Sequence, residues 1–138
     1  MVQVTLQTQS KLSAAGVRPT RQRLLIAALL WKGNECRHVT PEDMRREIQQ
    51  EGEDVALATI YNTLHQFTKA GLLREIVLAG GRTYFDTNLS PHFHYYYEEN
   101  GHLEDVAISP KQWHSLPSAP PGTEVKGVDV VIRVGERK

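Results

Sequence analysis

The sequence predicts an α+β protein in two parts, and three observations lead to this expectation. Four stretches of helical periodicity come first, and two short strand-like runs follow them. A polar segment that ends in proline comes next. The remainder alternates like strands around one short helix. We therefore expect a winged helix-turn-helix domain over residues 1–86, a hinge over 87–91, and a small α/β domain with a three-stranded sheet over 92–138.

The four helices are expected over residues 4–15, 18–31, 40–50 and 57–70. Each carries apolar residues at the spacing of a buried helix face. The third begins with a capping hydroxyl at Thr40, followed by a proline in the first turn. Gly16 and Gly71 stand just beyond the first and last helices, where glycine ends a helix most readily.

Two strands over 72–78 and 82–86 then complete the order of a winged helix-turn-helix. In that fold the fourth helix enters the major groove of double-stranded DNA, and arginines near the second helix can hold phosphates. The polar and basic candidates are Arg18, Arg21, Arg23, Thr59, Tyr61, Asn62 and His65. The alternative is that the arginines form an ordinary solvated helix face.

The second part carries a candidate metal site. If residues 92–98 form a strand, His92 and His94 lie on one face of it. A two-residue turn at Asn100-Gly101 would place Asp105 opposite Tyr96, diagonally beside His94 and on the same face. Two imidazoles with a carboxylate suit Fe(II), Mn(II) or Zn(II) better than a soft metal. The alternative is a half-exposed strand with ordinary surface histidines.

The rest of the second part is small. A strand is expected over 102–108, a helix over 110–116 capped by Ser109, and a last alternating strand over 128–134. Three strands and one short helix bury too little apolar surface to be stable alone. A homodimer would supply the missing core, and its two-fold axis would present two recognition helices to a palindromic site.

Composition sets further bounds. The chain has 16 basic and 16 acidic residues, so its net charge does not argue for nucleic acid. Cys36 is the single cysteine, which rules out an intramolecular disulfide and a multi-thiolate zinc site within one chain. The sequence has no membrane-length apolar run and no apolar signal-peptide core at its start. We therefore expect a cytoplasmic protein with no membrane partner.

These features together resemble the ferric uptake regulator superfamily of bacterial metal-dependent repressors. The resemblance runs over nearly the whole chain and is carried by residues 16–23, 38–43, 58–64, 70–72, 84–86 and 92–94. It implies a dimeric, metal-dependent regulator of transcription that responds to iron or peroxide and binds palindromic operators, and it implies no enzymatic activity.

The resemblance also implies a set of metal ligands. In the family, a regulatory ion is held by a histidine before the third helix, an acid at the end of the wing, and the His-x-His strand. The matching residues are His38, Asp86, His92 and His94. Asp86 and Asp105 match the two aspartates of the peroxide-sensing branch, in agreement with the face argument. The implied ion is Fe(II) or Mn(II), with Zn(II) as an alternative in purified protein.

The chain departs from the family at the structural zinc site. Tyr97 and Asn100 stand where most members have a Cys-x-x-Cys pair, so we expect no structural zinc held by four cysteines. This departure resembles the iron response regulator branch, which is associated with haem. The Cys-Pro motif of some haem-linked members is missing, because Arg37 follows Cys36. A haem-responsive regulator and a metal-independent winged-helix regulator stay as alternatives.

Overall fold

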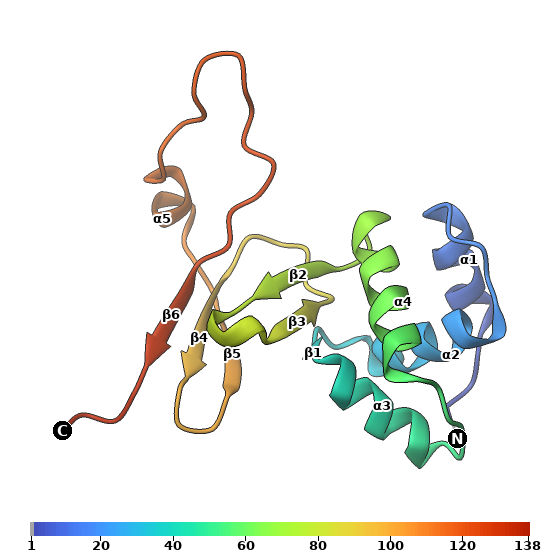
Figure 1. The fold of residues 1–138 in the computed structure, drawn as a ribbon. Helices are drawn as coiled ribbons and strands as arrows, with labels where there is room; N and C mark the ends of the chain where they lie inside the picture. The colour runs from blue at the N-terminus through green and yellow to red at the C-terminus, as the bar shows by residue number, and fades with distance from the viewer. Residues whose placement is uncertain (1) are drawn as a thin grey trace. The chain divides into compact units, whose positions relative to one another are not determined.

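The computed structural model describes residues 2–138 and divides into two compact units (Figure 1). Unit 1 runs to Leu89, and unit 2 spans Ser90–Lys138. The break lies within the polar segment 87–91. Among the residues described, none of the helices has the length and apolarity that a membrane span requires.

Unit 1 begins with four helices, as expected. They are α1 (Leu6–Ala14), α2 (Arg21–Leu30), α3 (Pro41–Gln50) and α4 (Leu57–Lys69), with a short 3-10 turn, Lys32–Asn34, after α2. The first two helices start later than predicted because Thr5 and Thr20 act as caps. The side-chain oxygen of each accepts a hydrogen bond from the main-chain nitrogen three residues on. Thr40 caps α3 in the same way and forms a reciprocal capping box with Asp43.

Helices α1 and α4 end with the same hydrogen-bond pattern. Gly16 and Gly71 take positive φ angles of 76° and 81°, a conformation that side chains with a Cβ disfavour. The chain then folds back, so that Val17 N donates to Leu12 O and Leu72 N donates to Phe67 O, both at 2.9 Å. This pattern satisfies carbonyls at the helix end that would otherwise lack a partner.

The core of unit 1 lies among its helices. In α2 five successive residues, from Ile26 to Leu30, are buried, so the helix is covered on most of its circumference. Phe67 of α4 is fully buried, and its ring lies 5.9 Å from that of Trp31. Burying a large apolar side chain contributes about 1.5–3 kcal/mol, which makes this cluster the main source of stability in unit 1.

A three-stranded sheet completes the winged helix. Its strands are β1 (His38–Val39), β2 (Arg74–Val77) and β3 (Thr83–Asp86), in the order β1-β3-β2, and neighbours are antiparallel. A 3-10 turn, Ala79–Gly81, joins β2 to β3. The two-residue strand β1 was not predicted, because it is too short to show a period. It pairs His38 with Asp86 across the ladder.

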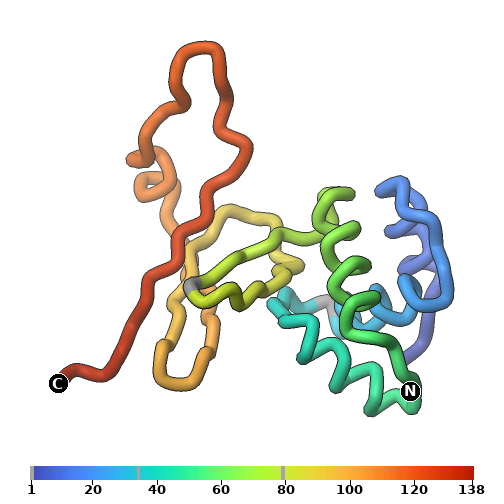
Figure 2. The backbone as a smooth tube through the Cα atoms, in the orientation of Figure 1, coloured from blue at the N-terminus to red at the C-terminus, as the bar shows by residue number. Residues whose placement is uncertain are grey.

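Unit 2 is a second three-stranded sheet with one short helix. It comprises β4 (Phe93–Tyr97), β5 (His102–Val106), α5 (Pro110–His114) and β6 (Val131–Val134). The strand order is β5-β4-β6, and β6 runs parallel to β4. Figure 2 shows the long excursion of the chain after α5 and its return along β4. β6 begins later than the predicted start at residue 128.

The turn between β4 and β5 differs from the predicted one. Tyr97 pairs with His102, so four residues connect the strands and not two. Gly101 takes φ = 71° and its nitrogen donates to Tyr97 O at 2.8 Å, while Asn100 Oδ1 accepts from His102 N at 2.9 Å. Asp105 therefore lies directly opposite His94 and not opposite Tyr96. The predicted register was wrong by two residues. The predicted face was right, because an even shift keeps every side chain on its side.

Candidate metal centre

Unit 2 brings together three of the predicted ligands. His94 lies on β4, Asp105 faces it from β5, and His92 directly precedes β4. The two histidine Nε2 atoms are 3.0 Å apart. Asp105 Oδ1 lies 3.2 Å from His94 Nε2 and 3.6 Å from His92 Nε2. Three donor atoms that share so small a volume can bind one divalent ion.

The main chain orients the ring of His92. Its Nδ1 lies 2.6 Å from the carbonyl oxygen of Ser90. A carbonyl oxygen only accepts hydrogen bonds, so Nδ1 carries the proton and donates. The lone pair is then left on Nε2, the atom that faces His94 and Asp105. This is the arrangement by which an imidazole is prepared to bind a metal ion.

Burial strengthens the case for a ligand site. The side chains of His92 and His94 are only 5% and 2% exposed, whereas that of Asp105 is 33% exposed. Two buried imidazoles whose Nε2 atoms meet at 3.0 Å cannot both carry a proton there. Two buried imidazoles beside a carboxylate form the donor set that a borderline divalent cation requires.

Unit 1 holds the other two predicted ligands as neighbours on one sheet. His38 of β1 and Asp86 of β3 are directly opposite each other. Asp86 is fully buried, and its Oδ1 accepts a hydrogen bond from Asn88 N at 2.8 Å. The ring of His38 lies edge-on to Tyr84, with 5.9 Å between centroids. A buried carboxylate is costly unless hydrogen bonds or a cation compensate it, so Asp86 is suited to bind an ion.

The predicted DNA-facing residues of α4 fall into two groups. Tyr61 and His65 stack nearly parallel, with 6.2 Å between ring centroids. Tyr61 also meets Phe85 of β3 edge-on at 6.1 Å, and His65 Nδ1 lies 3.4 Å from a carboxylate oxygen of Glu75 on β2. These two side chains therefore lie beside the wing, which is the hairpin formed by β2 and β3.

The second group lines a hollow of about 260 Å³ between α4 and the start of α2. Its lining includes Thr59 and Asn62, together with Arg23. The Arg23 guanidinium donates to Arg18 O at 2.9 Å and to Gln66 Oε1 at 2.7 Å. Sequence reasoning missed Gln66, although it follows Asn62 by one helical turn and so shares its face.

Arg21 does not join this group. Its guanidinium bonds to Glu53 at 2.7 Å; the side chain of Arg21 is 85% exposed and that of Glu53 is 37% exposed. An exposed ion pair of this kind contributes little to stability, about 0–1 kcal/mol. The three arginines predicted near the second helix therefore have different surroundings.

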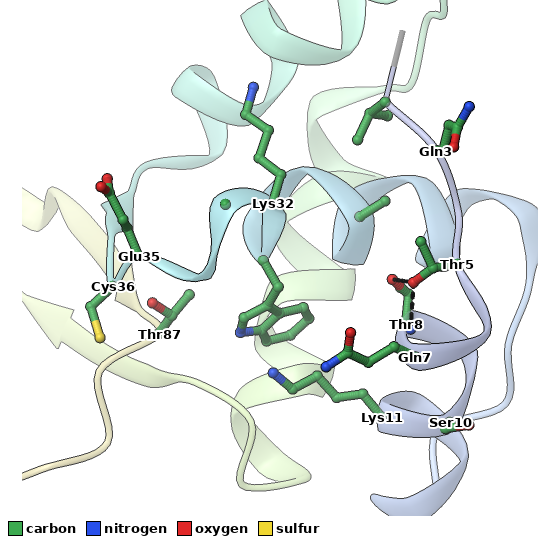
Figure 3. A pocket seen from close by; sticks show the side chains of 14 residues that line it. Gln3, Thr5, Gln7, Thr8, Ser10, Lys11, Lys32, Glu35, Cys36 and Thr87 are labelled. Atoms are coloured by element: carbon green, nitrogen blue, oxygen red, sulfur yellow. Dashed lines mark hydrogen bonds between the residues drawn. The ribbon is translucent and has the colours of Figure 1, made fainter.

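A larger hollow of about 810 Å³ lies between α1 and the end of α2 (Figure 3). The ammonium of Lys11 lies 4.3 Å above the ring of Trp31, and burial lowers the pKa of this lysine. Cys36 lies at the edge of the hollow and is exposed. A cation over an indole face is a stabilising packing contact, so Lys11 of α1 helps to hold that helix beside the end of α2.

A winged helix followed by a small sheet that gathers two histidines and an aspartate defines a two-part protein with DNA-binding architecture and candidate metal ligands. A sequence model of the ferric uptake regulator family matches residues 14–126 of this chain. The chain therefore belongs to the ferric uptake regulator family.

Two curated relatives illustrate the similarity. The ferric uptake regulation protein of Pseudomonas aeruginosa is 39% identical over 83 residues, which are 60% of this chain and 61% of that protein. The protein of the same name from Vibrio parahaemolyticus is 33% identical over 81 residues, 59% of this chain and 54% of the relative. The chain thus spans little more than half the length of the curated relatives that it matches.

Solved structures resemble the chain over more of its length. The ferric uptake regulator from Pseudomonas aeruginosa, determined with manganese, matches with a TM-score of 0.76 and 28% identity, over 95% of this chain and 98% of that one. The Vibrio cholerae ferric uptake regulator matches with a TM-score of 0.75 at 23% identity, over 92% of this chain and 98% of that one. The second likeness bears on the fold alone.

Proposed function

We propose that this protein is a metal-dependent transcriptional regulator that acts as a homodimer on palindromic operator DNA in the cytoplasm. Family membership and the winged helix support the DNA-binding part of the proposal. The convergence of His92, His94 and Asp105 within unit 2 is the observation that supports the metal-dependent part.

The proposed switch uses ligands from both units. His38 and Asp86 come from unit 1, and His92, His94 and Asp105 come from unit 2. An ion held by both sets would bind more tightly to the arrangement that permits DNA binding than to other arrangements. Its binding would then shift the population toward that arrangement, and DNA would in turn raise the affinity for the ion.

The donor set also guides the proposal for the ion. Three imidazoles and two carboxylates suit Fe(II) and Mn(II), and Zn(II) can occupy the same ligands in purified protein. The similar Pseudomonas aeruginosa regulator was determined with manganese. A bound Fe(II) would supply redox chemistry that a bound Mn(II) supplies far more weakly, so iron, manganese and peroxide are the proposed signals.

Anaerobic titration with Mn(II) and Fe(II) tests the proposal. We expect the wild-type protein to bind about one ion tightly per chain, as a single cluster of imidazole and carboxylate ligands would. We expect His92→Ala to lose that ion, because the substitution removes the donor whose lone pair is oriented by Ser90. Metal content after gel filtration and binding isotherms measure both results.

His114→Ala is the matched control. His114 ends α5 and is exposed, so its removal deletes an imidazole without touching the cluster. The control should bind the ion as the wild type does, and metal should raise the DNA affinity of both. Tight metal binding and metal-dependent DNA binding that persist in His92→Ala would contradict the proposed site.

A further inference from the structure

Arg37, the residue before His38, connects two helices of unit 1. Its Nη1 donates to the carbonyl oxygen of Leu29 at 3.1 Å, near the end of α2. The same guanidinium bonds both carboxylate oxygens of Glu47 on α3, at 3.0 and 2.6 Å. Three hydrogen bonds therefore fix this side chain between α2 and α3.

The main chain of Arg37 is attached just as closely to the end of the wing. Its nitrogen donates to Thr87 Oγ1 at 2.9 Å, and its carbonyl accepts from Thr87 N at 2.9 Å. The Thr87 hydroxyl also donates to that carbonyl at 3.2 Å. Thr87 directly follows Asp86, so these bonds extend the ladder in which His38 faces Asp86.

The contact with Glu47 has the features of a strong ion pair. The side chains of Arg37 and Glu47 are only 27% and 18% exposed, so water screens the pair less than it screens a surface pair. The two parallel N–H to carboxylate bonds fix direction as well as distance. A lysine could supply one point charge, but it could not make both bonds and still reach Leu29 O.

We infer that Arg37 is a positioning residue for metal binding. Its side chain fixes the short strand β1 to α2 and α3, and its main chain fixes β1 to the end of β3. The imidazole of His38 and the carboxylate of Asp86 are thereby held in register before an ion binds. The inference rests on the proposed function, since it assumes that His38 and Asp86 bind the ion.

Co(II) binding to Arg37→Ala and Arg37→Lys tests this inference, because Co(II) reports its ligands through visible absorption. We expect both variants to bind Co(II) about tenfold more weakly than wild type, a typical effect of losing a group that orients a ligand. We expect their absorption bands to shift toward those of His38→Ala, the reference for a site without that ligand. Glu47→Gln should show a smaller change in the same direction.

Arg46→Ala is the control. Arg46 lies on the same helix as Glu47, but its ion pair is with Asp43 of that helix and does not involve β1. It should keep wild-type affinity and spectrum. A purely structural role predicts a different result for Arg37→Ala: a lower melting temperature of the metal-free protein with an unchanged Co(II) spectrum and affinity. That result would overturn the inference.

The remaining outcomes separate the inference from the proposed function. If Arg37→Ala does not fold, as judged by circular dichroism, Arg37→Lys and Glu47→Gln carry the test, and wild-type Co(II) binding by both overturns the inference. If the ion is lost in His92→Ala but unchanged in the Arg37 variants, only the inference fails. If the wild type binds no ion that depends on His92, the proposed function and the inference both fail.

Discussion

A single main-chain carbonyl determines how His92 is presented. Because Ser90 O accepts from Nδ1, the main chain fixes the tautomer of the ring and helps to orient it. His94 is positioned differently, by its place on β4 directly opposite Asp105. A loop carbonyl thus orients one imidazole, and strand register places the other.

Tyr97 provides a test at the residue scale that does not involve metal. Its hydroxyl donates to Glu104 at 2.7 Å, and this hydrogen bond raises the pKa of Tyr97 above its ordinary value near 10. The bond stabilises the protonated phenol. Its contribution to the free energy of unfolding is therefore complete below about pH 10 and is lost as pH rises through the folded-state pKa. Absorbance titration of wild type against Tyr97→Phe isolates the ionisation of this tyrosine.

Glu104→Gln is the informative variant for that titration. It keeps an acceptor for the hydroxyl but removes the carboxylate charge, so the pKa of Tyr97 should fall toward the ordinary tyrosine value. Glu136→Gln, a charge-matched change at an exposed position of unit 2, should leave the titration unchanged. A Tyr97 titration that is identical in wild type and Glu104→Gln would show that the bond is not formed in solution.

At the scale of elements, α4 and the start of α2 should act together on DNA. A duplex selected by the wild-type protein from a random-sequence library is the probe. Arg23→Ala should weaken binding to all DNA sequences. It should also make the slope of log affinity against log salt concentration less steep by about one unit, as the loss of one phosphate contact would. Asn62→Ala should relax the sequence preference at one base pair. If Asn62 contacts a base edge, the loss of binding free energy for the preferred base is about 1–3 kcal/mol.

Lys111→Ala is the charge-matched control for Arg23→Ala. Lys111 lies on α5 in unit 2 and is exposed, so its removal changes the net charge equally. It should leave both the affinity and the salt slope close to those of the wild type. Equal losses in Arg23→Ala and Lys111→Ala would mean that net charge governs binding, and would remove the assignment of this face to DNA.

The helices could be predicted because their period, caps and terminal glycines are all local signals. Thr40 caps the helix it precedes, and Gly71 follows the end of α4, whereas the caps Thr5 and Thr20 were missed and the first two helices were predicted to start too early. β1 could not be predicted in this way, because a two-residue strand exists only through its partner β3. The β4–β5 register was also missed, since Asn100-Gly101 marks a turn without fixing how many residues the turn contains.

For the whole molecule, the small core of unit 2 makes dimerisation testable. Among the described residues, Leu103 is the one apolar side chain of unit 2 that is fully buried, and Ile132 is 40% exposed. A sheet with so little core needs a partner surface. We expect sedimentation equilibrium to give twice the chain mass of 15.6 kDa. We also expect the unfolding midpoint in urea to rise with protein concentration.

Urea unfolding at several protein concentrations can also contradict the proposed homodimer. A dimer that unfolds to separate chains is stabilised by mass action, so its midpoint must move. A stable interface is occupied at about tens of micromolar. A monomeric mass in the ultracentrifuge at that concentration, together with an unfolding midpoint that does not change with concentration, would contradict the proposed homodimer.

The candidate metal residues of unit 2 could be predicted from strand periodicity and a hairpin turn, but the contacts that orient them could not. His92, His94 and Asp105 share a face, and a period of two is visible in the sequence. The contact of His92 with Ser90 O depends on the path of the loop before β4. Arg37 reaches Glu47 only after α3 has packed against α2. Such supports follow from tertiary structure, for which the sequence carries no periodic signal.

The parallel pairing of β6 with β4 has a consequence for the order of folding. β4 and β5 are joined by four residues, so their pairing closes a short loop and can form within microseconds. Val131 of β6 pairs with His94 of β4, and the chain between them includes β5, α5 and a long connection. Closing this longer loop loses more chain entropy than closing the β4–β5 turn. The strand that carries His94 should therefore gain one neighbour early and the other late, with β6 completing the sheet as the slow step of assembly in unit 2.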